Sequence, residues 1–68
     1  MIHSVEQIKE KFPEGTRIKL IRMFDEQAPK PGTLGTIHGV DDVGTILVRW
    51  DNGSYLGLIY NIDQFILI

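Results

Sequence analysis

The stretch from residue 31 to residue 54 alternates short apolar runs with turn-forming residues, and this spacing constrains the fold more than any other feature. It reads PGTLGTIHGVDDVGTILVRWDNGS. The pair Asn52-Gly53 is a strong signal for a two-residue β-hairpin turn, in which both residues take a positive φ. The sequence therefore predicts an antiparallel meander whose neighbouring strands are joined by tight turns.

Alternation of apolar and polar residues extends this pattern to most of the chain. The predicted strands cover residues 16–23, 35–40, 45–50, 55–60 and 65–68. Because side chains alternate between the two faces of a strand, Trp50 is expected in the core on the same face as Ile46 and Val48. Gly39 is expected at a bulge and Gly44 in a left-handed turn. Strands this short predict a mainly β fold, a small five-stranded barrel, rather than a sandwich, which needs more strands.

A short amphipathic helix is expected before the first strand, over residues 4–12. Ser4 and Gln7 have the spacing of a capping box, and Pro13 ends the helix. Val5, Ile8 and Phe12 form its apolar stripe. Since so short a helix is marginal alone, we expect it to dock on the barrel and to cover the apolar terminal strand, residues 65–68. The chain is predicted to be a single domain over 1–68, with 1–12 as a helical extension and 13–68 as the barrel.

The composition argues against several kinds of chemistry. The 68 residues contain no cysteine, which excludes thiol catalysis and cysteine-based zinc sites, and His3 and His38 are too few for another zinc site. Ser4 and Ser54 do not lie in a nucleophile elbow, and the glycines form no phosphate-binding loop. Asp41, Asp42 and Asp51 flank turns, where such side chains accept hydrogen bonds from nearby backbone amides. The sequence therefore predicts no enzyme activity, no metal and no cofactor.

Charge and hydropathy favour a protein that works away from membranes. The net charge is −2, and no stretch is long and apolar enough to span a bilayer. The first residues lack the basic and apolar regions of a secretory signal. We therefore expect a cytoplasmic location, no membrane association and no small-molecule substrate. An acidic average also argues against strong nonspecific binding to polyanions.

Three segments of the chain resemble a known family. They are FPEGTRIKLI from residue 12, QAPKPGTLGTIHGVDDVGTI from residue 27 and WDNGS from residue 50. Over residues 12–68 the chain is similar to a family of bacterial domains catalogued as a domain of unknown function. That resemblance implies an SH3-like barrel and an origin among short bacterial proteins and their mobile elements, and it brings no activity with it.

The loop over residues 24–31 and the aromatic residues outside the core are the first candidate binding site. A long polar loop on a small barrel is a common place for binding, and exposed aromatic rings can dock a peptide. The predicted partner-binding residues are Phe24, Asp25, Glu26, Tyr55 and Tyr60. They would grip a protein or peptide partner if the rings lie close together.

A basic strand face is the second candidate. Arg17, Lys19 and Arg49 lie on strand faces opposite the predicted core and could contact nucleic-acid phosphates. The sequence thus favours a noncatalytic protein-interaction module. The alternative is a nucleic-acid-binding accessory domain, for example of a mobile genetic element.

Overall fold

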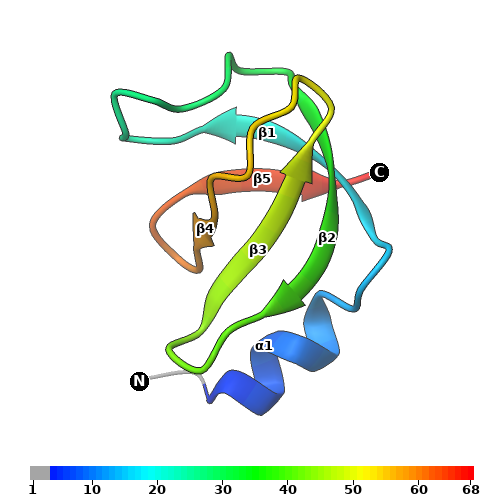
Figure 1. The fold of residues 1–68 in the computed structure, drawn as a ribbon. Coiled ribbons are helices and arrows are strands. Elements are labelled where there is room, and N and C mark those ends of the chain that lie inside the picture. The colour runs from blue at the N-terminus through cyan, green and yellow to red at the C-terminus, as the bar shows by residue number, and fades with distance from the viewer. Residues whose placement is uncertain (1–3) are drawn as a thin grey trace.

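A computed structural model describes residues 4–68 as one curled antiparallel sheet with a short helix at one end (Figure 1). The elements in chain order are α1 (Val5–Lys11), β1 (Arg17–Arg22), β2 (Leu34–Val40), β3 (Thr45–Trp50), β4 (Leu58–Ile59) and β5 (Gln64–Leu67). The strand order is β4-β3-β2-β1-β5. This confirms the mainly β fold of five strands with an N-terminal helix. The hydrogen-bonded ladder is not closed, because β4 and β5 are its two edges.

The inner face of the sheet carries the core. Alternate residues of β1, β2 and β3 are buried together with one residue of β4 and one of α1. They are Ile18, Leu20, Ile37, Ile46, Val48, Trp50, Leu58 and Ile8. The prediction that Trp50 is a core residue is confirmed, since its side chain is 1 % exposed. Its indole Nε1–H donates to the carbonyl of Leu56 at 2.7 Å, so the one polar atom of this ring is satisfied.

Both turns that flank β3 are three-residue loops. In the first, the N–H of Gly44 donates to the carbonyl of Asp41, and the N–H of Asp41 donates to the carbonyl of Thr45. In the second, the N–H of Gly53 donates to the carbonyl of Trp50 in the same way. Gly44 and Gly53 have φ of 88° and 94°, which confirms the left-handed prediction for Gly44.

The prediction of a two-residue turn at Asn52-Gly53 is wrong, because Asn52 does not have a positive φ. A loop of three residues in which only the last is left-handed needs a single glycine. The side chain of Asn52 instead accepts a hydrogen bond from the N–H of Ser54 at 2.9 Å. It therefore stabilises the loop as a turn-capping residue.

Strand β4 is much shorter than the predicted 55–60. Backbone groups just before it bond elsewhere: the carbonyl of Leu56 accepts from Trp50, and the N–H of Leu56 lies 3.3 Å from Ser54 Oγ. These groups are then not available to a ladder with β3. The other strands match their predictions within two residues at each end, and the expected bulge at Gly39 appears as a register shift between Ile37 and Gly39.

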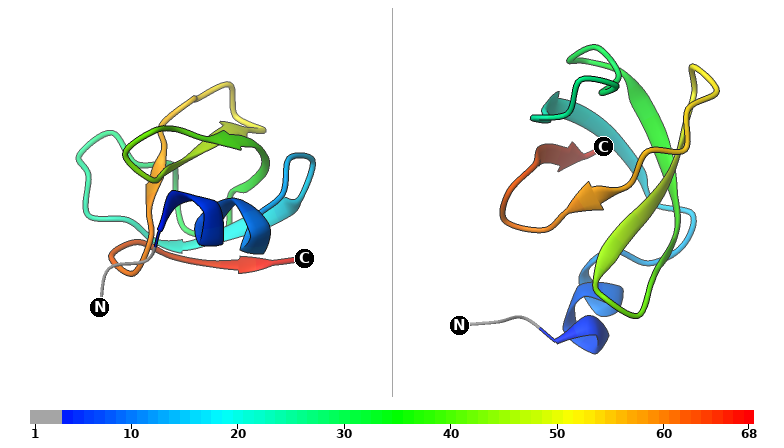
Figure 2. Two further views of the ribbon diagram at one scale, coloured as in Figure 1. Left: turned by 90° about the horizontal axis from the view of Figure 1, so that it is seen from below. Right: turned by 60° about the vertical axis from the view of Figure 1, so that its left-hand side comes forward.

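Helix α1 begins at the predicted capping box. The hydroxyl of Ser4 accepts from the N–H of Gln7 at 3.1 Å, and Gln7 Oε1 accepts from the N–H of Ser4 at 3.2 Å. The helix lies across one end of the curled sheet and contacts β2 (Figure 2). Ile8 is its buried residue. No helix in the described part of the chain is long and apolar enough to cross a bilayer.

The expectation that α1 covers the terminal strand is wrong for most of β5. The ring of Phe12 does pack on Phe65, with 5.3 Å between ring centroids. Ile66 and Leu67, however, remain 48 % and 51 % exposed. The helix contacts β2, the central strand, and it meets β5 through Phe12 at its C-terminal end, which packs on Phe65.

We predict that Gly35→Ala strongly destabilises the fold. A Cβ atom at this position would lie 2.7 Å from Val48 Cγ1 and 2.8 Å from Trp50 Cε3, both closer than real contacts allow. Overpacking of this kind costs about 1–3 kcal/mol. Urea unfolding followed by Trp50 fluorescence measures the loss, and a midpoint equal to that of the wild type would show that the core tolerates the added methyl group.

Candidate functional site

The three aromatic residues of the predicted partner site lie in different surroundings. Phe24 is 68 % exposed in the loop after β1, and the Cζ atom of the Arg22 guanidinium lies 4.6 Å from its ring centroid. Tyr55, in the β3–β4 connection, packs edge-on against His38 of β2. Tyr60, after β4, packs against Phe12. No ring contact within residues 4–68 joins the three, so they do not form the single platform that the sequence suggested.

The acidic residues of the predicted site belong to the β1–β2 loop. Asp25 and Glu26 are both exposed. Asp25 Oδ1 accepts a hydrogen bond from the N–H of Gln27 at 2.8 Å, and the N–H of Ala28 donates to the carbonyl of Asp25. Asp25 therefore shapes a local turn. His38 is exposed, and His3 lies outside the described residues.

The basic face contains an ion pair that sequence analysis missed. Arg17 donates two hydrogen bonds to the carboxylate of Asp51, at 2.9 and 2.7 Å, and a third to Thr36 Oγ1 at 2.8 Å. Arg17, Thr36 and Arg49 lie side by side on adjacent strands. Lys19 and Arg49 are exposed as predicted. Because the Asp51 charge offsets that of Arg17, this face is less basic than the sequence indicated.

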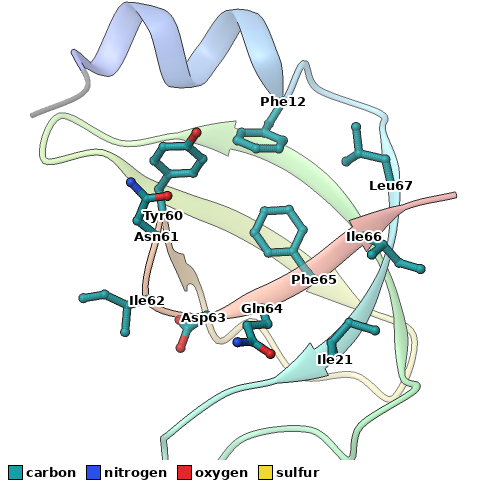
Figure 3. Close-up of a pocket in the computed structure, with 10 residues that line it drawn as sticks. All are labelled: Phe12, Ile21, Tyr60, Asn61, Ile62, Asp63, Gln64, Phe65, Ile66 and Leu67. Atoms are coloured by element: carbon teal, nitrogen blue, oxygen red, sulfur yellow. The ribbon is translucent and has the colours of Figure 1, made fainter. Parts of the chain in front are cut away.

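A groove of about 480 Å³ runs beside β5 (Figure 3). It is bounded by the end of α1, the β4–β5 turn, β5 and the bulged residue of β1. Its lining residues are Phe12, Ile21, Tyr60, Asn61, Ile62, Asp63, Gln64, Phe65, Ile66 and Leu67. Tyr60 is thus the one member of the predicted partner site that lies in this groove. The sequence signal for the β5 residues of the groove is the apolar terminal segment, residues 65–68, which the sequence predicts to lie under the helix.

Polar groups of the groove are held in place by neighbouring residues. Lys11 Nζ donates to the hydroxyl of Tyr60 at 2.9 Å and lies 5.4 Å from its ring centroid. Asp63 Oδ2 accepts from the N–H of Ile59 at 2.8 Å. Asn61, at the tip of this turn, has a φ of 68°. The turn therefore presents a fixed wall on one side of the groove.

The two edge strands of the sheet differ in how well they are protected against pairing with another chain. Strand β4 is two residues long, and the carboxylate of Asp63 satisfies the N–H of Ile59. Strand β5 has four residues without a proline or a charge. Short edges and charged side chains are common protections against pairing with other chains, and β5 has neither.

The arrangement suits noncovalent binding. The exposed side chains that line the groove are mostly apolar, and its carboxylate, Asp63, is already hydrogen-bonded to the backbone. Within residues 4–68 no three His, Cys, Asp or Glu side chains come close enough to hold a metal ion. A surface of this kind gains free energy by burying apolar area and by pairing backbone groups.

We predict that the pairing of Asp51 with Arg17 stabilises the fold and that this contribution is lost only at acidic pH. Its hydrogen bonds with Arg17 lower the pKa of Asp51 below the ordinary value of 3.8. Below that value the unfolded chain binds a proton that the folded chain does not, so stability is lost as the pH falls. The wild type should therefore exceed Asp51→Asn in stability at neutral pH by a constant, small amount, which declines below about pH 5 and vanishes once folded Asp51 is protonated.

Urea midpoints in a pH series measure this difference. The matched background is Arg17→Gln, in which Asp51→Asn should no longer produce the same acid-dependent difference. The effect is small because the two side chains are 40 % and 50 % exposed. A difference that grows in acid would contradict the assignment.

Comparison with known proteins places this fold in a family. A family model described as "Domain of unknown function (DUF4314)" matches residues 1–68, which include α1 and all five strands. No curated protein and no solved structure matches the chain. The resemblance noted for residues 12–68 is confirmed and extends to the first residue, while the bacterial origin and the SH3-like classification stay predictions. The chain belongs to the DUF4314 family of domains of unknown function.

Proposed function

We propose that this domain is a noncatalytic protein-interaction module of the cytoplasm, and that it binds its partner in the groove beside β5. The observation that carries the proposal is the combination of an exposed apolar groove with an unprotected sheet edge. Ile21, Ile62, Ile66 and Leu67 are each at least 42 % exposed and line this one groove. Contiguous exposed apolar surface of this kind marks interaction sites.

The chemistry of the groove supports binding rather than catalysis. General acid–base catalysis needs a titratable group free to exchange a proton with the substrate. The Asp63 carboxylate holds the β4–β5 turn, and the Tyr60 hydroxyl accepts a hydrogen bond from Lys11. Both groups therefore have structural roles.

Binding through Phe24, Asp25, Glu26 and Tyr55 stays a prediction. The ring of Phe24 is covered on one face by Arg22, and Tyr55 packs against His38, so each offers a small separate surface. Tyr60 supports the proposed groove directly, since it lies between Phe12 and the β4–β5 turn.

The alternative function, a nucleic-acid-binding accessory domain, has weaker support. Arg17 is engaged by Asp51. Lys19, Arg49 and the neighbouring Arg22 are then the cations of the outer face that have no ion pair within residues 4–68. Affinity for nucleic acid grows with the number of phosphates neutralised. Three cations should give only weak binding that disappears as salt is added.

Site-specific photo-crosslinking tests the proposal. A photoreactive amino acid replaces Ile62 on the groove wall, and the matched control carries it at Val43, which is 84 % exposed in the β2–β3 turn. In a lysate of the organism that encodes the domain, we expect discrete protein adducts from position 62 and none of these from position 43. The same adducts from both positions, or none from either, would contradict the groove as the binding surface.

A nucleic-acid titration tests the alternative in the same preparation. Salt-sensitive binding of single- or double-stranded DNA that is lost in Lys19→Ala and Arg49→Ala, together with nuclease-sensitive adducts, would favour the nucleic-acid function over the proposed one.

A further inference from the structure

We propose that the groove takes an extended segment of a partner protein, which adds to the sheet as a further strand along the free edge of β5. The segment has apolar side chains on its inward face and acidic side chains on its outward face. This inference rests on the proposed function and specifies the chemistry of the partner.

Backbone groups of β5 define where the added strand would bond. The N–H of Ile68 donates to the carbonyl of Arg17, so these two residues form a hydrogen-bonded pair of the β1–β5 ladder. Hydrogen-bonded pairs alternate with non-bonded pairs in an antiparallel ladder, which makes Lys19 and Ile66 the next bonded pair. The N–H and C=O groups of Phe65 and Leu67 therefore point away from β1, toward the free edge.

The inward face of the groove is apolar. Phe65 and Leu67 pair with Leu20 and Ile18 of the core, which places their side chains on the inner face of the sheet. Phe65 packs against Phe12, and Figure 3 shows Phe65 and Leu67 projecting toward Phe12, away from Gln64. Alternate side chains of an added strand would enter this space, where valine-sized apolar groups displace water from the half-buried rings of Phe12 and Phe65.

The outward face next to β5 is basic. Lys19 and Arg22 pair with Ile66 and Gln64, so both cations stand on the outer face one strand away from β5. At the other boundary of the groove, Lys11 is exposed beside Tyr60. The acid among the lining residues, Asp63, is held by the backbone of Ile59. The edge is thus locally positive in a chain of net charge −2, and acidic side chains on the partner would complement it.

Charge also selects between a partner segment and a second copy of this chain. Pairing of β5 with the β5 of another copy would place the sequence QFIL along the edge. That segment has no acidic residue that could pair with Lys19, Arg22 or Lys11. An extended segment in which acidic residues alternate with apolar ones meets all three requirements. Its backbone bonds to the edge of β5, its apolar side chains pack on the inner face, and its acidic side chains lie near the cations of the outer face.

The test uses the isotope-labelled full chain and a short capped peptide of alternating valine and glutamate. Amide exchange is followed by NMR with and without saturating peptide. We expect exchange at Phe65 and Leu67 to slow by about tenfold, the effect of one new hydrogen bond each, with little change at Ile66 and Ile68, which already bond to β1.

Two altered peptides probe the separate parts of the inference. A peptide with lysine in place of glutamate should bind less tightly, because it meets Lys19, Arg22 and Lys11 with like charge. A peptide N-methylated at alternate backbone positions keeps the side chains but cannot complete the ladder, so it should not slow exchange at Phe65 and Leu67. Equal binding of the lysine peptide, or equal protection by the methylated one, would overturn the inference.

Variants of the protein give the complementary test. Leu67→Pro removes an edge N–H that is not part of the β1 ladder, whereas Leu67→Ala removes the side chain and keeps that N–H. We expect the proline variant to lose peptide binding and the alanine variant to retain it in part, with the Ile68 amide protected in both as evidence of folding. Peptide binding that survives Leu67→Pro would contradict strand addition.

Other occupants of the groove have distinct signatures. Protection at Phe65 and Leu67 that rises with protein concentration, without peptide, would assign the edge to a second copy and overturn the inference. Shifts at Phe12, Tyr60 and Ile62 without slowed exchange at the edge would also overturn it, yet would leave the proposed function intact. A titration in which the peptide changes neither shifts nor exchange rates would overturn strand addition at β5. Crosslinking at position 62 would still decide the proposed function separately.

Discussion

The core of this domain depends on one large side chain, Trp50, packing against a strand position that has no side chain. Gly35 pairs with Trp50 across the β2–β3 ladder, and no room remains for a Cβ atom there. Trp50 is therefore buried while its Nε1–H reaches the carbonyl of Leu56. That hydrogen bond holds the segment before β4 in an irregular path. One packing contact thus determines both the centre of the core and the shortness of one sheet edge.

The shortness of β4 explains why the two edges differ. A two-residue edge needs little protection, and Asp63 satisfies its N–H at Ile59. The same Asp63 lies in the turn that leads into β5 and walls the groove. Strand β5 then leaves the turn with an uncharged sequence and a free side. The proposed binding surface therefore follows from the path of the chain after β3, in which a short β4 and the Asp63 turn leave β5 as the unprotected edge.

Local rules predicted the parts of the fold that depend on neighbouring residues. The capping box of Ser4 and Gln7, the left-handed Gly44 and the burial of Trp50 follow from spacing within a few positions. Apart from the turn at Asn52-Gly53, the wrong predictions involved contacts between distant segments. Arg17 and Asp51 lie 34 positions apart in the sequence, and no local pattern distinguishes Asp51 from the other turn aspartates. Likewise, Tyr60 joins Phe12 rather than Tyr55 because α1 ends beside the β4–β5 turn.

Phe65 and Phe12 connect the groove to the stability of the domain. Both pack against the edge of the core and both line the groove. A chain of 68 residues buries a small core and is only marginally stable. A strand added at β5 would cover Phe65 and extend the same apolar cluster. A ligand that binds only the folded state stabilises it by an amount that grows with the logarithm of the ratio of ligand concentration to Kd. The open edge therefore couples binding to folding: the surface that the isolated domain leaves exposed is the surface whose occupation strengthens its core.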